Sequence, residues 1–273
     1  MMTYPFSKET EYGRITSVKD TNEDYHSKDS ISASGLKKIY QKSVAHYLDD
    51  QFKKTKEMEF GTMIHTLLLE GQEQFSKEYY LLPKLDMRKK ADKELYEQHK
   101  INADNRIMYC DQDLINGITY KEAFSLISKN FYDNEIAVDL CKGENEISHY
   151  GTFKDVDVRC RPDTLGTNFI SDIKTCSDNS PYAFYHQIKR LNYDLQALFY
   201  CDVLCRTPES FRFIAIETKY PFSVQVYGLT ENTIQSGYDK YNIALDRWKE
   251  YLRTKEIKLY QSSNQDSDGT IYL

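Results

Sequence analysis

Residues 160–175 read CRPDTLGTNFISDIKT, and this stretch is the strongest indication of the fold. Alternating apolar and polar residues predict a strand on each side, and LGTN between them is typical of a turn. Side chains in a strand over 169–175 alternate between two faces, so Asp172 and Lys174 share one face. Asp163 ends the preceding strand, so we expect a hairpin to bring its carboxylate close to that of Asp172.

This trio of charged residues suits a metal-dependent hydrolysis. Two converging carboxylates repel each other, and one pKa rises unless a cation joins them. Mg²⁺ or Mn²⁺ takes oxygen ligands and resolves that conflict. Such an ion binds a phosphoryl oxygen as a Lewis acid and lowers the pKa of a bound water, while Lys174 orients the water or neutralises developing charge. The alternative is a surface hairpin with an ordinary salt bridge.

The rest of the chain predicts an α/β (α+β) architecture. Hydrophobic residues at helical spacing favour helices over 31–50, 59–71, much of 83–130, 180–205 and 230–253. Ser34 is the expected N-cap of the first helix, and Gly71 the expected stop of the second. Further strands are expected over 145–151, 153–163, 211–220 and 223–229.

The composition and charge of the chain exclude some classes of function. The chain has 273 residues, with 36 Lys and Arg against 42 Asp and Glu, so its formal net charge is −6. This excludes a uniformly basic nucleic-acid binder but allows a local basic track. No apolar run approaches the ~20 residues of a membrane span, and the N-terminus lacks a signal-peptide pattern, so we expect a cytoplasmic protein without membrane contact. The six cysteines form no CxxC pair and are expected to be reduced thiols.

Four motifs together resemble a known nuclease superfamily. Pro162-Asp163, eight residues and then Asp172-Ile173-Lys174 resemble the PD-(D/E)xK signature. Two further stretches are similar to motifs of its RecB-like branch, the QhxxY motif at Gln196–Tyr200 and the helix histidine at His65. ISASGLKKIYQKSVAHYL, LDMRKK and the order of ENEIS and CRPD resemble RecE-type exonuclease VIII proteins of phage and prophage origin. The resemblance extends from about Tyr25 to Leu252.

The resemblance implies a fold and a domain plan. The fold would be a PD-(D/E)xK core, with a central mixed β-sheet flanked by helices and a helical N-terminal part. Residues 1–30 would be a polar and irregular lead, 31–260 a single nuclease domain and 261–273 a mobile tail.

The resemblance also assigns residues to roles. The metal ligands would be Asp163, Asp172, the Ile173 carbonyl and His65, with Glu146 on the first strand serving a second metal or its waters. Lys174 would be the catalytic lysine, and Gln196, Tyr200 and Tyr193 would position DNA and active-site groups. Each role has a purely structural alternative. His65 would be a helix histidine that is hydrogen-bonded to its neighbours, Glu146 would be a solvated strand glutamate, and the helix with Gln196 would be an amphipathic helix with a polar edge.

A basic stretch departs from the family pattern, which often reads DRRT-like where this chain has DMRKK. Arg88, Lys89, Lys90 and Lys93 are still expected to track DNA phosphates and, with Lys189 and Arg190, to line an inner channel. A solvated helix face is the rival interpretation, because interspersed acids dilute the charge.

The implied activity is a Mg²⁺-dependent double-stranded DNA exonuclease, with Mn²⁺ as a possible substitute and one or two ions per site. It would degrade the 5′ strand from duplex ends to leave 3′ overhangs, as a ring-shaped homo-oligomer (a tetramer by resemblance) beside a single-strand annealing recombinase. The alternatives are a structure-specific or restriction-type endonuclease and a non-catalytic DNA-binding module. No iron–sulfur cluster is expected, because Cys201 and Cys205 are the only closely spaced cysteines.

Overall fold

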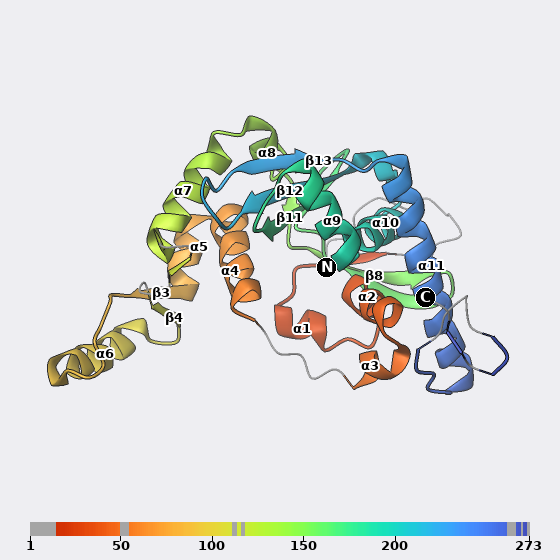
Figure 1. The fold of residues 1–273 in the computed structure, drawn as a ribbon, viewed down its shortest axis with the longest axis horizontal. Helices are drawn as coiled ribbons and strands as arrows, with labels where there is room; N and C mark the ends of the chain where they lie inside the picture. The colour runs from red at the N-terminus through yellow and green to blue at the C-terminus, as the bar shows by residue number, and fades with distance from the viewer. Residues whose placement is uncertain are drawn as a thin grey trace.

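A five-stranded sheet, which contains residues 164–165 and 170–175 of the 160–175 stretch, lies at the centre of the molecule (Figure 1). The computed structural model describes residues 15–49, 55–110, 114–115, 118–260, 266–268 and 270–271. The strand order is β13-β12-β11-β10-β7, with bounds Val224–Tyr227, Phe211–Glu217, Ile170–Cys176, Thr164–Leu165 and Glu144–Asn145. β11 and β12 are parallel and the other neighbours antiparallel, so the sheet is mixed, as expected.

Two helices connect the parallel strands β11 and β12, since parallel neighbours need a long crossover. They are α9 (Pro181–Leu191) and α10 (Tyr193–Val203). The sequence predicted a single helical segment over 180–205. The chain instead bends at Asn192, whose left-handed φ of 50° ends α9 and lets α10 start in a new direction.

Each face of the sheet packs against its own layer of helices, because strand side chains alternate. Ile173, Ile214 and Ile216 join one hydrophobic cluster with residues of α4 (Lys56–His65), α5 (Gly71–Glu78), α7 (Tyr120–Tyr132) and α8 (Glu135–Asp139). Ile170, Phe213 and Ala215 join a second cluster with α2 (Ala33–Gln41), α9, α10 and α11 (Glu231–Thr254). Asp172 and Lys174 therefore lie on the α10 side.

Helices α10 and α11 approach each other closely at Gly237. A Cβ built there would lie 2.6 Å from the backbone oxygen of Asp194, so a larger residue would separate the helices. This contact braces α10, which carries the QhxxY stretch.

A second sheet of four strands lies beside the first, in the order β1-β8-β9-β2. Its strands are Thr16–Val18, Ser148–Phe153, Val156–Cys160 and Ile31–Ser32. Val156, Val158 and Cys160 are buried, as the alternation predicted. The expected hairpin between the strands 153–163 and 169–175 is wrong in one respect: β9 ends at Cys160 in this second sheet, and the short strand β10 pairs with β11.

The N-terminal helical part begins differently from the prediction. Ser32, not Ser34, caps α2, because its side chain accepts a hydrogen bond from the Gly35 N–H. The expected helix over 31–50 is two helices, α2 and α3 (Val44–Leu48), because Ser43 caps a new turn.

The helix expected over 59–71 changes its winding halfway. α4 ends at His65, a π-helix η1 spans Thr66–Glu70, and α5 follows from Gly71. Gly71 has a φ of +88°, which explains the glycine where the sequence predicted a stop.

An arm projects from the body at the lower left of Figure 1. It consists of β3 (Tyr79–Leu82), β4 (Ile107–Cys110) and α6 (Lys90–Ala103). The short strands β5 (Leu114–Ile115) and β6 (Ile118–Thr119) lead from it into α7.

The expected lead and tail fall partly outside the described residues. Within 1–30, where an irregular chain was expected, the described part holds β1 and the helix α1 (Asn22–His26). Most of 261–273 is not described, so the mobile tail stays a prediction. The remaining element is the 3-10 turn η2 (Pro208–Ser210).

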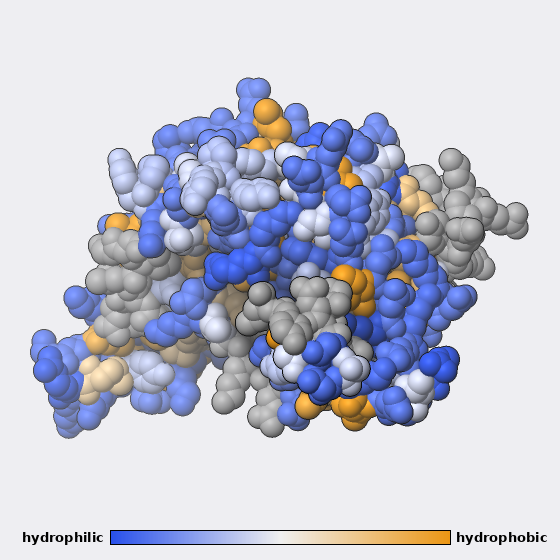
Figure 2. All heavy atoms as spheres, turned by 45° about the vertical axis from the view of Figure 1, so that its right-hand side comes forward, coloured by the Kyte–Doolittle hydropathy of each residue, from blue (hydrophilic) through white to orange (hydrophobic). Residues whose placement is uncertain are grey.

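The face of the molecule drawn in Figure 2 is mostly polar. Hydrophilic residues predominate on it and hydrophobic ones lie scattered, which is typical of a surface that faces water. Among the described residues, no helix combines the length and apolar character needed to cross a membrane.

Candidate active site

Asp163 and Asp172 meet across the β10–β11 pair. Thr164 lies opposite Ser171, so the register extended by one residue sets Asp163 against Asp172. Both carboxylates are buried, and Asp163 Oδ2 accepts the Ile173 N–H at 2.6 Å. The convergence that the sequence predicted is present, and it is fixed by backbone pairing.

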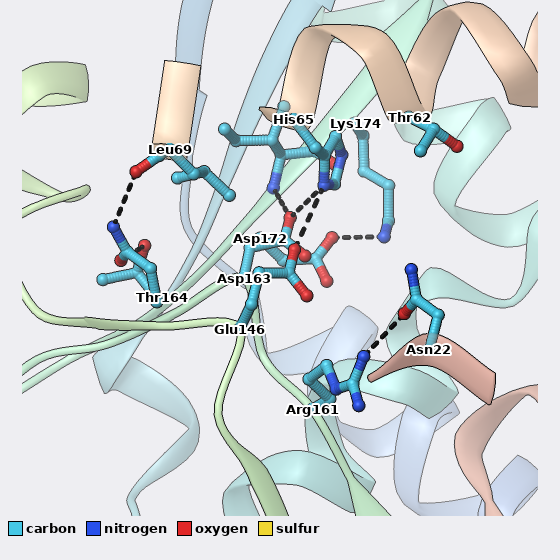
Figure 3. A network of polar contacts seen from close by, with 12 residues as sticks. Asn22, Thr62, His65, Leu69, Glu146, Arg161, Asp163, Thr164, Asp172 and Lys174 are labelled. Carbon is cyan, nitrogen blue, oxygen red and sulfur yellow. Dashed lines mark hydrogen bonds and ion pairs between the residues drawn. The ribbon is translucent and has the colours of Figure 1, made fainter. Parts of the chain in front are cut away.

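The π-helix η1 holds His65 beside these acids (Figure 3). A π turn carries an extra residue, which leaves the Leu69 carbonyl free to accept from Asn145 Nδ2 at 3.3 Å. Asn145 Oδ1 in turn accepts from the Thr164 hydroxyl at 2.9 Å, so η1 is tied to the strand next to Asp163. His65 Nε2 lies 3.0 Å from the Ile173 carbonyl oxygen.

Glu146 completes a cluster but does not lie on a strand, so its predicted placement is wrong. β7 ends at Asn145, and Glu146 occupies the following turn with a φ of 54°. Its N–H donates to the Asp163 carbonyl at 3.1 Å, which turns its side chain toward the acids. His65 Nδ1 lies 3.8 Å from Glu146 Oε1 and 3.5 Å from Asp163 Oδ2.

A polar chain runs from Asp172 into α2. Lys174 pairs with Asp172 Oδ2, and Gln196 Nε2 donates to Asp172 Oδ1 at 2.8 Å. Gln196 Oε1 accepts from Lys37 Nζ at 3.0 Å. Lys37 was not among the residues predicted from the sequence, although it lies in the ISASGLKK stretch. The helical spacing of that stretch does not indicate that α10 packs over Lys37.

The two tyrosines of the QhxxY region differ in position. Tyr193 lies at the site, with the ammonium of Lys174 4.7 Å from its ring centre and that of Lys37 5.4 Å away. Tyr200 lies one step behind the site, where its hydroxyl donates to the Arg161 carbonyl at 3.2 Å. Tyr200 thus holds the turn that leads to Asp163 and does not touch the carboxylates directly.

Burial and mutual repulsion set the charges of the cluster. Burial raises the pKa of Asp163, and the neighbouring Asp172 carboxylate raises it further, to about 7. Burial disfavours the charged ring of His65, but Asp163 and Glu146 outweigh it and raise its pKa to about 9. Lys174 is buried too, yet Asp172 keeps its pKa above the ordinary value. Without a metal, protons therefore balance part of the negative charge.

The donor set fits a divalent cation. His65, Glu146 and Asp163 each offer one ligand atom, and these atoms lie within 4.8 Å of one another. Asp172 Oδ2 is buried and is paired with Lys174. Carboxylate oxygens with one imidazole nitrogen suit Mg²⁺ or Mn²⁺. His65 Nε2 contacts the Ile173 carbonyl oxygen, so the role of that carbonyl as a metal ligand stays a prediction.

The predicted basic track falls into two separate places. Arg88, Lys89, Lys90 and Lys93 lie exposed on the projecting arm at the start of α6. Arg88 Nε bonds Asp86 at 3.0 Å there, so part of its charge is neutralised. Lys189 and Arg190 lie at the end of α9, where the Arg190 carbonyl accepts from Gln41 of α2.

Comparisons with known proteins agree with this fold. The model of a family described as a PDDEXK-like domain of unknown function (DUF3799) matches residues 32–260. A crystal structure described as a "Putative exonuclease" from Eubacterium rectale has a TM-score of 0.57 and 14% sequence identity, covering 91% of this chain and 92% of that one. At this identity the likeness shows the fold alone. A search of curated proteins finds no match. The chain belongs to the PDDEXK-like DUF3799 family.

Proposed function

We propose that this protein is a Mg²⁺-dependent exonuclease for double-stranded DNA, with Mn²⁺ as a substitute ion. One observation supports it above the others. His65, Glu146 and Asp163 form a metal-competent cluster, and the Asp172–Lys174 pair lies directly beside it. A nuclease needs those two features within reach of one phosphodiester.

The chain's own residues divide the chemistry between them. A bound divalent cation would supply Lewis acidity at the phosphoryl oxygen and a water of lowered pKa. His65, Glu146, Asp163 and Asp172 would hold it. Lys174, kept charged by Asp172, would orient the attacking water and offset the charge that grows on the phosphate.

The direction and setting of the reaction rest on the resemblance to RecE-type proteins. We propose that the 5′ strand is degraded from a duplex end, processively, leaving a 3′ single strand for phage-type recombination. A ring-shaped homotetramer would keep the enzyme on DNA, and a single-strand annealing recombinase would receive the product. The place of action would be the bacterial cytoplasm.

An end-labelled duplex tests the proposal against its main rival, an endonuclease. Linear duplexes protected at the 5′ or the 3′ ends are incubated with and without Mg²⁺, beside a covalently closed circle. The proposal expects Mg²⁺-dependent loss of the 5′ label from unprotected ends and an intact circle. Cutting of the circle would instead support an endonuclease.

A non-catalytic DNA-binding module is the second rival. The intact Asp163, Asp172 and Lys174 set argues against it. Calorimetric titration with Mg²⁺ or Mn²⁺ separates the two, because the proposed enzyme must bind the ion and a module without metal chemistry need not. The absence of any heat from either ion would count for the module.

A further inference from the structure

Lys37 extends from α2 to the edge of the site. Its Nζ donates to Gln196 Oε1 at 3.0 Å, and the other end of that amide bonds Asp172 at 2.8 Å. Lys37 is half-buried, so its charge lies in a partly dehydrated place next to the proposed reaction centre.

The charge of Lys37 is not neutralised. Lys174 pairs with the Asp172 carboxylate, whereas no carboxylate of the described residues lies within 4.0 Å of Lys37 Nζ. Its hydrogen-bond partner is a neutral amide, and its other neighbour is the face of Tyr193, at 5.4 Å from the ring centre. Burying a cation without a counter-ion costs free energy, which an anionic ligand would recover.

The titration of Lys37 agrees with this geometry. Burial lowers its pKa, and repulsion by Lys174 lowers it further, to about 7, although Asp172 partly opposes both. A lysine that lacked only solvent but had a carboxylate partner would not lose its proton so readily.

We propose that Lys37 is a phosphate-binding residue, which holds a DNA phosphodiester beside the one that Lys174 and the acids act on. Both ammonium groups lie over the ring of Tyr193, so two positive charges lie near each other at the edge of the site. The missing counter-charge of Lys37 is then a substrate phosphate. This inference rests on the proposed function, because it takes the ligand to be DNA.

The salt dependence of DNA binding tests a direct phosphate contact. Each phosphate that a cation neutralises adds about 0.9 to the slope of log K against log salt on duplex DNA. The full chain is titrated with a fluorescent duplex in chelator at about pH 6, where the lysine is charged. We expect Lys37→Met and Lys37→Gln each to lower the slope by about 0.9 and Lys37→Arg to keep it.

The variants separate charge from hydrogen bonding. Lys37→Gln retains a donor for Gln196, so it distinguishes the lost charge from a lost support of that amide. Lys129→Met is the matched control, because Lys129 is an exposed lysine of α7 that pairs with Asp133. We expect it to leave the slope unchanged.

The outcomes are decisive for Lys37. An unchanged slope in both uncharged variants, with their folding verified by circular dichroism, overturns the proposal, and so does a wild-type chain that does not bind DNA. Cleavage of DNA by the wild type with Mg²⁺ is measured separately. If the wild type cuts DNA but the variants leave the slope unchanged, the Lys37 proposal is wrong and the proposed function stands. If the variants lower the slope but the wild type does not cut DNA, Lys37 binds phosphate and the proposed nuclease function is wrong.

Discussion

Replacing Asp163 by asparagine should stabilise the metal-free protein while it destroys the metal site. The amide can still accept the Ile173 N–H, which Asp163 accepts at 2.6 Å, but it removes a buried charge that faces Asp172. A residue that serves function at the expense of stability behaves in this way.

The magnitude follows from the shifted pKa. Asp163 has a folded-state pKa of about 7 against an ordinary value of 3.8, and one pKa unit corresponds to about 1.36 kcal/mol. The folded state therefore binds more protons than the unfolded state over this range, and its stability falls as the pH rises. We expect Asp163→Asn to gain little near pH 4 and about 2–4 kcal/mol above pH 7.

Urea unfolding in chelator at pH 4 to 8, followed by circular dichroism, measures this gap. Asp157→Asn is the control, because Asp157 is exposed on β9 and should show no growing difference. Adding Mn²⁺ should raise the melting temperature of the wild type and not of Asp163→Asn. If the variant is no more stable than the wild type at pH 8, the two carboxylates do not repel each other in the folded protein.

Three further predictions concern the same site. Gln196→Leu removes the amide between Lys37 and Asp172, so cleavage should fall about 10- to 100-fold in a single-turnover assay; a wild-type rate would contradict this role. Lys174→Met should abolish cleavage and leave calorimetric metal binding in place, and loss of both together would mean that Lys174 acts through the metal site. Metal binding must displace the proton of His65, whose pKa is about 9, so affinity should rise with pH and protons should be released up to that value. Calorimetry in buffers of different ionisation enthalpy measures the release, and an affinity that is constant from pH 6 to 9 would disprove it.

The meeting of Asp163 and Asp172 could be predicted because it depends on a period of two and a short turn. The residue pattern of a strand determines which side chains share a face, and the register determines which residues of the two strands lie opposite each other. What the pattern could not show is that β9 and β10 belong to different sheets, since a break at Cys160 requires knowledge of both partners.

The position of His65 was anticipated, but its cause was not. The bond between Asn145 and the Leu69 carbonyl ties the π turn to the strand beside Asp163, and these residues are 76 positions apart. Glu146 was expected on a strand, whereas the hydrogen bond to the Asp163 carbonyl holds it in a turn. Such long-range contacts override local propensity.

The role of the basic stretch stays a prediction. Its composition indicates a phosphate track, and the structure places the segment on the arm, where Arg88 bonds Asp86. Lys37 lies beside the site with no carboxylate of the described residues paired to it, and only the packing of α10 against α2 reveals this.

Cleavage of a linear duplex by matched proteins shows whether this cluster hydrolyses DNA with a divalent metal. The wild type and Asp172→Asn are purified in parallel and assayed with Mg²⁺, with Mn²⁺ and with chelator. We expect only the wild type with a metal to cut the duplex. Cleavage that persists in chelator, or in Asp172→Asn, would disprove metal-dependent hydrolysis at this site.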